Sequence, residues 1–158
     1  MSGIDLSDNR LNGTIPSELK KLDTIRALNL SLNDLRGKIP TTFSSLAQIE
    51  SLDLSSNNLG GNIPLQLTEL SSLAVFSVAH NYLSGSTPEM KGQFSTFDDS
   101  SYKGNPFLCG PPLPRSCNPN AKYEKLPNGT DTDEDNGNWL DMLDFWVNFL
   151  LLTQQYCW

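Results

Sequence analysis

The chain has 158 residues, a formal net charge of −7 and 37% apolar residues, which suits one domain followed by a tail. No stretch gathers the Lys and Arg needed to neutralise phosphates, so the composition argues against nucleic-acid binding. The acidity is uneven, with a charge balance of −2 up to Cys117 and −5 from Asn118 to Trp158. The segment after Cys117 therefore differs in composition from the rest.

The chain repeats one pattern, visible in IDLSDNRLNGTIP, LNLSLNDLRGKIP and LDLSSNNLGGNIP. A spacing of 24 residues relates the Asn, Gly and Pro positions of four units, and such a period is typical of a solenoid. These positions are Asn9, Asn33, Asn57 and Asn81; Gly13, Gly37, Gly61 and Gly85; and Pro16, Pro40, Pro64 and Pro88.

Each unit predicts a short strand, a turn and a return segment. Side chains alternate in direction along a strand, so Leu28 and Leu30 face the core while Asn29 faces outward. The Gly and Pro of the unit disfavour a helix, so the return segment is expected to be irregular or 3₁₀. Stacked units bury a leucine core that no single unit could close. We therefore expect an α/β solenoid with short parallel strands on its concave face.

The repeated Asn stands at the end of every predicted strand. Its amide can bond backbone groups left open by the turn, so we interpret Asn9, Asn33, Asn57 and Asn81 as a structural ladder and not as a binding site. Buried polar groups are as a rule paired, which favours this interpretation.

The pattern LxxLxLxxNxLxGxIP, as in IESLDLSSNNLGGNIP, resembles the plant-specific leucine-rich repeats. The ending LAVFSVAHNYLSGSTPEMKGQFSTFDDSSYKGNPFLCGPPLPRSC is similar to the end of the ectodomain in plant leucine-rich repeat receptor-like proteins. The resemblance covers Met1 to roughly Cys117 strongly and the tail only loosely. It implies a cell-surface receptor with one membrane span and no kinase domain.

Aromatic residues follow the last repeat and are expected to cover its open leucines. Cys109 and Cys117 flank the Pro-rich loop GPPLPRS, and a short rigid loop favours a disulfide between them. The competing interpretation is a metal pair, although zinc sites need four ligands and the only His is distant. The resemblance also implies that this pair closes the cap, whereas Cys157 is left over.

The sequence predicts four parts: repeats over 1–90, a disulfide-bonded cap over 91–117, an acidic linker over 118–138 and a Trp-rich remnant of a membrane anchor over 139–158. The apolar run from Phe145 to Leu152 is short and interrupted by Asn148, so it is not expected to span a bilayer. It could instead lie in the interface. We expect the family pattern to stop near residue 145.

Met1 is not followed by a basic region and an apolar run, so no signal peptide is predicted and the chain reads as a truncated fragment. Three sequons permit N-glycosylation if the chain enters the secretory pathway: Asn12, Asn29 and Asn128. The full-length relative is expected at the extracellular face of the plasma membrane. Membrane association of this chain would need the complete anchor.

Outward-facing strand positions are the candidates for ligand binding on the concave face, as in other solenoids. For any one of them a plain solvated surface is the competing interpretation. They are Asp5, Ser7 and Asp8; Arg26, Asn29, Ser31 and Leu32; Glu50, Asp53, Ser55 and Ser56; and Val75, Ser77, Ala79 and His80.

No catalytic residues, metal site or cofactor are predicted. The chain has one His, no Gly-rich phosphate loop and no metal-ligand cluster. The acidic run from Asp131 to Asp135 lacks the Gly and the distant Glu of an EF-hand loop. The chain is therefore not expected to be an enzyme.

The sequence favours a non-catalytic module that binds a peptide or protein. The resemblance implies a role in defence or developmental signalling through a partner receptor kinase. Two alternatives stay open. The first is a secreted inhibitor like those of fungal polygalacturonases, which share the repeat and a CGPPLP cap. The second is a truncated decoy or pseudogene product that does not signal.

Overall fold

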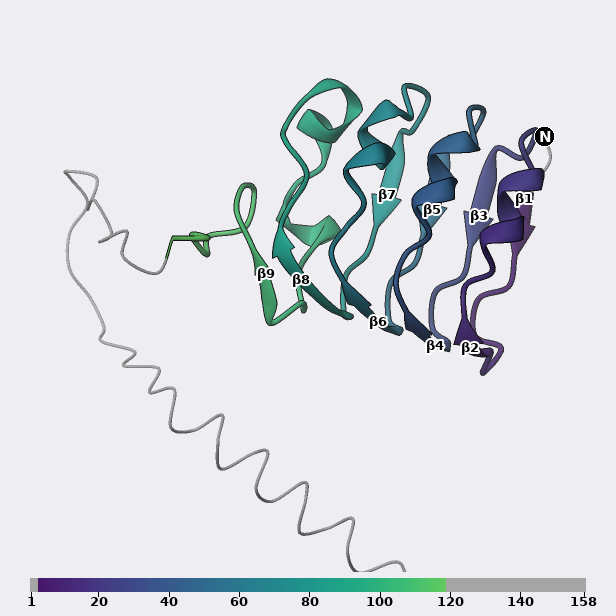
Figure 1. Cartoon of the computed structure of the whole chain (residues 1–158), viewed down its shortest axis with the longest axis horizontal. Coiled ribbons are helices and arrows are strands. Elements are labelled where there is room, and N and C mark those ends of the chain that lie inside the picture. Colours follow the sequence, from purple (N-terminus) through teal and green to yellow (C-terminus); the bar gives the residue numbers. More distant parts are fainter. Residues whose placement is uncertain (1–2, 119–158) are drawn as a thin grey trace, which may run out of the picture. The chain divides into compact units, whose positions relative to one another are not determined.

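The computed structural model describes residues 3–118, which form a stack of repeats with two parallel sheets along it (Figure 1). The first sheet, here the concave sheet, has the order β1 (Gly3–Asp5), β3 (Ala27–Asn29), β5 (Ser51–Asp53) and β7 (Val75–Ser77). The second sheet has the order β2 (Asn12–Thr14), β4 (Asp34–Gly37), β6 (Asn58–Gly61), β8 (Tyr82–Ser86) and β9 (Phe107–Cys109).

The return segments are 3₁₀ helices, and residues 3–118 contain no α-helix. Pro16, Pro40 and Pro64 precede the first three helices with φ between −67° and −62°, the value that the proline ring imposes. The sequence-based prediction of short parallel strands with 3₁₀ return segments is thus confirmed. The helices are η1 (Ser17–Lys21), η2 (Thr41–Ser45), η3 (Leu65–Glu69), η4 (Gly92–Thr96) and η5 (Asp99–Ser101).

The strands of the concave sheet pair in the register of the sequence repeat. Ile4 lies opposite Leu28, Leu28 opposite Leu52, and Leu52 opposite Phe76. The middle units are buried most completely because they have a packed unit on both sides, and Leu52 has no exposed surface. Apolar side chains thus form one continuous core along the stack.

Buried Asn side chains bond the turn of each unit to the unit before it. Asn57 Oδ1 accepts the backbone N–H of Leu35 at 3.0 Å. Its Nδ2 donates to the carbonyls of Leu30 at 2.9 Å, Leu54 at 3.2 Å and Ser55 at 3.1 Å. Each such amide therefore satisfies backbone groups of two units inside the core, where an unpaired group is costly.

The ladder contains one member that the sequence prediction missed. Asn105 Oδ1 accepts the N–H of Leu83 at 3.0 Å, and its Nδ2 donates to the carbonyls of Val78 and Tyr102. Asn9, by contrast, is exposed, and within residues 3–118 its Nδ2 donates only to the Ser7 carbonyl. The 24-residue spacing from Asn81 already points to Asn105.

The cap is a fifth unit built with aromatic side chains. Phe94, Phe97 and Tyr102 stand 24 residues after Leu70, Leu73 and Val78 and are buried like them. Their rings pack on Phe76, with centroid distances of 5.2, 5.6 and 6.0 Å. Aromatic surface thus closes the end of the leucine core.

A disulfide joins Cys109 and Cys117 across the Pro-rich loop, with 5.0 Å between the two Cα atoms. The bridge predicted from the sequence is therefore present. It ties the residues after β9 back onto that strand, beside the hydrogen bond from the Gly110 N–H to the Arg115 carbonyl at 2.8 Å.

Replacing Asn57 by Ala is expected to lower the free energy of unfolding by at least about 2 kcal/mol, because several buried backbone groups lose their partner. Asn9→Ala is the matched control, since it removes one exposed bond, and its cost is expected below about 1 kcal/mol. Urea unfolding of the full chain followed by circular dichroism measures both. Equal losses would contradict the ladder's role.

Replacing Tyr102 by Phe is expected to raise the free energy of unfolding at neutral pH by about 1 kcal/mol, because the buried hydroxyl has no hydrogen-bond partner among residues 3–118 and its burial is costly. Burial raises the pKa of Tyr102 to about 12, so unfolded chains release this proton first as the pH rises above 10. The wild type should therefore lose about 1.4 kcal/mol for each pH unit between pH 10 and 12 from this residue.

Tyr102→Phe should remove that alkaline loss, whereas the exposed-site control Tyr82→Phe should keep it. The measurement is urea unfolding at pH 7, 10, 11 and 12. Parallel pH profiles for the wild type and Tyr102→Phe would contradict this account of the buried hydroxyl.

Candidate protein-recognition surface

The parallel register aligns side chains of successive strands into columns across the concave sheet. One column holds Asp5, Asn29, Asp53 and Ser77, and a second holds Gly3, Ala27, Ser51 and Val75. Because the strands are short and each is fixed by its neighbours, these columns form a rigid array. A ligand lying across the strands would contact one residue from each unit.

The polar residues of the first column also bond their own turns. Asp5 Oδ1 accepts the N–H of Ser7 at 3.0 Å, and Asn29 and Asp53 bond the residue two positions on in the same way, at 3.0 and 2.9 Å. Asp5 accepts hydrogen bonds from both the backbone N–H and the hydroxyl of Ser7. These two bonds, with a smaller contribution from a hydrogen bond from Asn29, hold the pKa of Asp5 below its usual range. The column is therefore partly occupied in shaping the fold.

Arg26 and Glu50 form an ion pair between neighbouring units, with 2.8 Å between Nη1 and Oε1. Both side chains are about half exposed, so the pair contributes little to stability, on the order of 1 kcal/mol or less. It does present two charges of opposite sign at the start of β3 and β5. Ala74, 24 residues after Glu50, continues this position without a charge.

The register places one predicted candidate in the second column. Val75 pairs with Ser51 and therefore belongs to the column of Ala27. Its side chain is 55% exposed, the most apolar surface that the four strands of the concave sheet offer. The sequence analysis missed Ala27, Ser51 and Ala74, although the 24-residue period marks all three as free positions.

Two further candidates are not available at the surface. Ser31 and Ala79 are only 6% and 4% exposed, because the chain turns toward the second sheet directly after them. Ser7 and Ser55, at the same place in their units, are half-buried. The prediction that Ser31 and Ala79 face a ligand is therefore wrong.

The residue before each ladder Asn adopts a left-handed conformation. Asp8, Leu32, Ser56 and His80 have φ between 54° and 56°. This conformation costs a non-glycine residue about 1 kcal/mol or more, and the Asn bonds that follow hold it in place. Asp8, Leu32 and His80 are exposed, and Leu32 shows 57% of its surface.

Backbone hydrogen bonds join the cap to the residues that follow β7. The backbone N–H of Val78 donates to the Ser101 carbonyl, and the backbone N–H of His80 donates to the Lys103 carbonyl, each at 2.8 Å. Gly104 takes the left-handed position that His80 holds one unit earlier, with φ of 75°. The candidate surface therefore reaches the exposed Lys103, which the sequence analysis did not assign.

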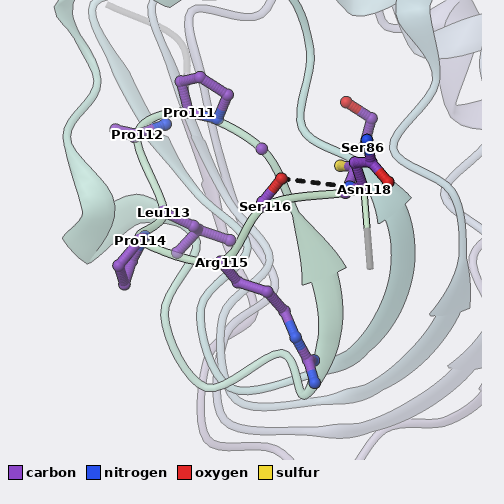
Figure 2. A pocket seen from close by; sticks show the side chains of 10 residues that line it. Ser86, Pro111, Pro112, Leu113, Pro114, Arg115, Ser116 and Asn118 are labelled. Atoms are coloured by element: carbon purple, nitrogen blue, oxygen red, sulfur yellow. Dashed lines mark hydrogen bonds between the residues drawn. The ribbon is translucent and has the colours of Figure 1, made fainter. Parts of the chain in front are cut away.

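The surface near the cap has several hollows. One of about 290 Å³ lies between β7 and the cap and is lined by Val75, Ser77, Asp98 and Ser100, among others. Another, of about 590 Å³, lies against the disulfide-bonded loop, where Figure 2 shows Pro111, Pro112, Leu113 and Pro114 on one side and Ser86 and Asn118 on the other. The first adjoins the columns of the concave sheet, since Val75 and Ser77 line it.

Within residues 3–118 no group of three His, Cys, Asp or Glu side chains is placed to hold a metal ion. The same residues contain no helix long and apolar enough to cross a membrane. The acidic run, the Trp-rich segment, Asn128 and Cys157 lie outside the described residues. Asn12 is exposed on β2, and Asn29 is half-buried on β3.

A family model described as Leucine rich repeat matches residues 2–59. The chain is 68% identical over 151 residues to Cuscuta receptor 1 of Solanum lycopersicum, and 51% identical over 56 residues to Receptor like protein 21 of Arabidopsis thaliana. These matches cover 96% and 35% of the chain. The chain contains leucine-rich repeats and is similar to plant receptor-like proteins. It spans 13% and 6% of the length of these two relatives.

Solved receptor ectodomains share the fold. The BIR2 ectodomain of Arabidopsis thaliana is 44% identical with a TM-score of 0.67, over 72% of this chain and 59% of that one. The Arabidopsis receptor kinase HAESA, solved with the peptide hormone IDA and the co-receptor SERK1, is 40% identical with a TM-score of 0.60, over 67% of this chain and 17% of that one.

The match to the tomato receptor extends beyond the repeats. Since 151 of 158 residues align, the aligned region includes the acidic segment and reaches at least residue 151. The expectations that the resemblance weakens after Cys117 and that the family pattern stops near residue 145 stay predictions, because the 68% identity is that of the whole alignment.

Replacing Gly104 by Ala is expected to lower the free energy of unfolding by more than about 2 kcal/mol. Ala is strained at the positive φ of this position. Its Cβ would also overlap with His80 Nδ1 and would lie only 3.0 Å from His80 Cα. Gly92→Ala is the matched control, because its φ is 54° but its Cβ would meet nothing within 4 Å. We expect about 1 kcal/mol for the control in urea unfolding.

Proposed function

We propose that this chain is a non-catalytic recognition module of a plant cell-surface receptor-like protein. It binds a peptide or protein across the columns of the concave sheet and acts through a partner receptor kinase in defence or developmental signalling. The whole receptor lies in the plasma membrane with this module outside the cell, and the parts after Cys117 serve as an acidic linker and anchor region.

The observation that carries this proposal is the array of half-buried side chains, with the exposed Val75 at one end, on a scaffold whose strands are fixed by buried amides. Ala27, Ser51 and Val75 align across three strands, beside Asn29 and Asp53. Such an array has no group arranged for bond making or breaking, but it offers a repeated, stiff surface for contact. Val75 supplies an exposed apolar anchor at its cap end.

The relatives support the same assignment. The name Cuscuta receptor 1 describes a receptor, and the similar HAESA ectodomain was solved with a peptide hormone and a co-receptor. In this proposal the peptide lies along the concave sheet, and the co-receptor contacts the capped end. The concave-face candidates from the sequence stay in this proposal, except for the buried Ser31 and Ala79.

Two alternatives predict other behaviour. A secreted inhibitor would block a polygalacturonase without any kinase partner, and a non-signalling product would bind neither. The CGPPLP cap is shared with the inhibitors, so the enzyme assay is the direct comparison. Inhibition of a polygalacturonase by the full chain would favour the first alternative over the receptor role.

Replacing Val75 by Asp is expected to weaken binding of the SERK1 ectodomain by about tenfold or more, because a charge would replace the apolar anchor. Leu65→Asp is the matched control, since Leu65 is a 63% exposed apolar residue on η3 and not on the concave sheet. Binding is measured by biolayer interferometry on the secreted full chain, and the control should change affinity less than twofold. Equal losses, or no SERK1 binding by the wild type, would refute this partner.

A further inference from the structure

Two sequons lie within residues 3–118, and the fold explains only one of them. Asn29-Leu30-Ser31 ends β3 of the concave sheet, and Asn12-Gly13-Thr14 forms β2 of the second sheet. Both match the acceptor pattern for N-glycosylation, which calls for an accessible surface site.

The fold itself requires the residues of the Asn29 sequon. Asn29 stands where neighbouring units carry Asp5 and Asp53, and all three bond the N–H of the Ser two residues on. The middle residue, Leu30, is a core position. The sequon thus arises because Asn replaces Asp in a repeated turn, and its presence says nothing about a sugar.

The surroundings of Asn29 also disfavour a glycan. Its side chain is half-buried between the in-register Asp5 and Asp53, and its Oδ1 already accepts the Ser31 N–H at 3.0 Å. The hydroxyl-bearing Ser31 is 6% exposed. Modification would place a polar branched polymer between two rows of a sheet whose side chains are tightly spaced.

The Asn12 sequon has no such structural role. The positions of Asn12 and Thr14 are filled by Arg36 and Lys38 in the next unit, so the fold requires neither an amide nor a hydroxyl there. Arg36 and Lys38 are exposed although units pack on both sides of them, so a packed neighbouring unit does not by itself bury these positions. No hydrogen bond to the Asn12 side chain is found in the part of the chain that the structure describes.

We propose that Asn12 is an N-glycosylation site and that Asn29 stays unmodified, which leaves the concave sheet free of sugar. The Asn12 Nδ2 forms a bond to C1 of an oligosaccharide carried on a polyprenyl pyrophosphate. The bond between C1 and the pyrophosphate oxygen breaks, the lipid pyrophosphate leaves, and the amide loses one proton. This inference rests on the proposed function, since the reaction takes place in the secretory pathway.

Trypsin separates the two sites, because it cuts after Arg10 and Lys20 and after Arg26 and Arg36. The full chain is secreted from leaf cells with an added signal peptide and an added C-terminal reporter sequon. Mass spectrometry before and after peptide N-glycosidase then reads residues 11–20 and 27–36 independently. We expect glycan on most of the first peptide and on less than a tenth of the second.

Asn12→Gln should remove the glycan, and Thr14→Val should do the same while keeping Asn12. Asn29→Asp is the matched control, because Asp keeps the Oδ1 acceptor that the repeat uses and removes only the sequon. It should leave the glycan pattern unchanged. Glycan on Asn29, or an unmodified Asn12 in chains whose reporter sequon is glycosylated, would overturn the proposal.

The result is independent of partner binding, because the added signal peptide imposes secretion and the readout is the modification alone. Loss of SERK1 binding with Asn12 glycosylated would count against the proposed function only. Binding of SERK1 by chains that lack sugar at Asn12 would count against this inference only.

Discussion

The buried Asn amides are the constraint on which the rest of the structure depends. Each amide accepts a backbone N–H from the preceding unit and donates to carbonyls of both units, as Asn57 does with Leu35, Leu30 and Leu54. The bonds form inside an apolar core, where leaving the same groups unpaired would be costly. They hold the left-handed residue before each Asn, and thereby fix the corner between the concave sheet and the second sheet.

This corner decides which polar residues are free for recognition. Asp5, Asn29 and Asp53 face outward but also bond their own turns, while Ser31 is drawn into the core as the chain turns. The residues that no structural bond occupies are fewer and more apolar, with Val75 and Leu32 the most exposed. The candidate ligand surface therefore consists of the exposed positions whose side chains make no bond within the repeat.

The capped end combines three stabilising features. Aromatic rings replace leucines over the last core layer, Asn105 adds a final rung to the ladder, and the Cys109–Cys117 disulfide ties down the loop after β9. The close approach of Gly104 to His80 brings the cap directly onto the last concave row. A rigid end of this kind is suited to holding a second protein, because little ordering is lost on contact.

The sequence by itself determined the period, the strands, the ladder and the disulfide, because each follows from residues recurring at a fixed spacing or from a short loop. It did not determine the burial of Ser31 and Ala79 or the register between β8 and β9. Between β8 and β9 the paired residues Ser84 and Phe107 are 23 apart, whereas Arg36 and Asn58 are 22 apart, so the spacing shifts there. Only the stacking of units decides such contacts, because burial and register depend on neighbours in space and not on neighbours in sequence.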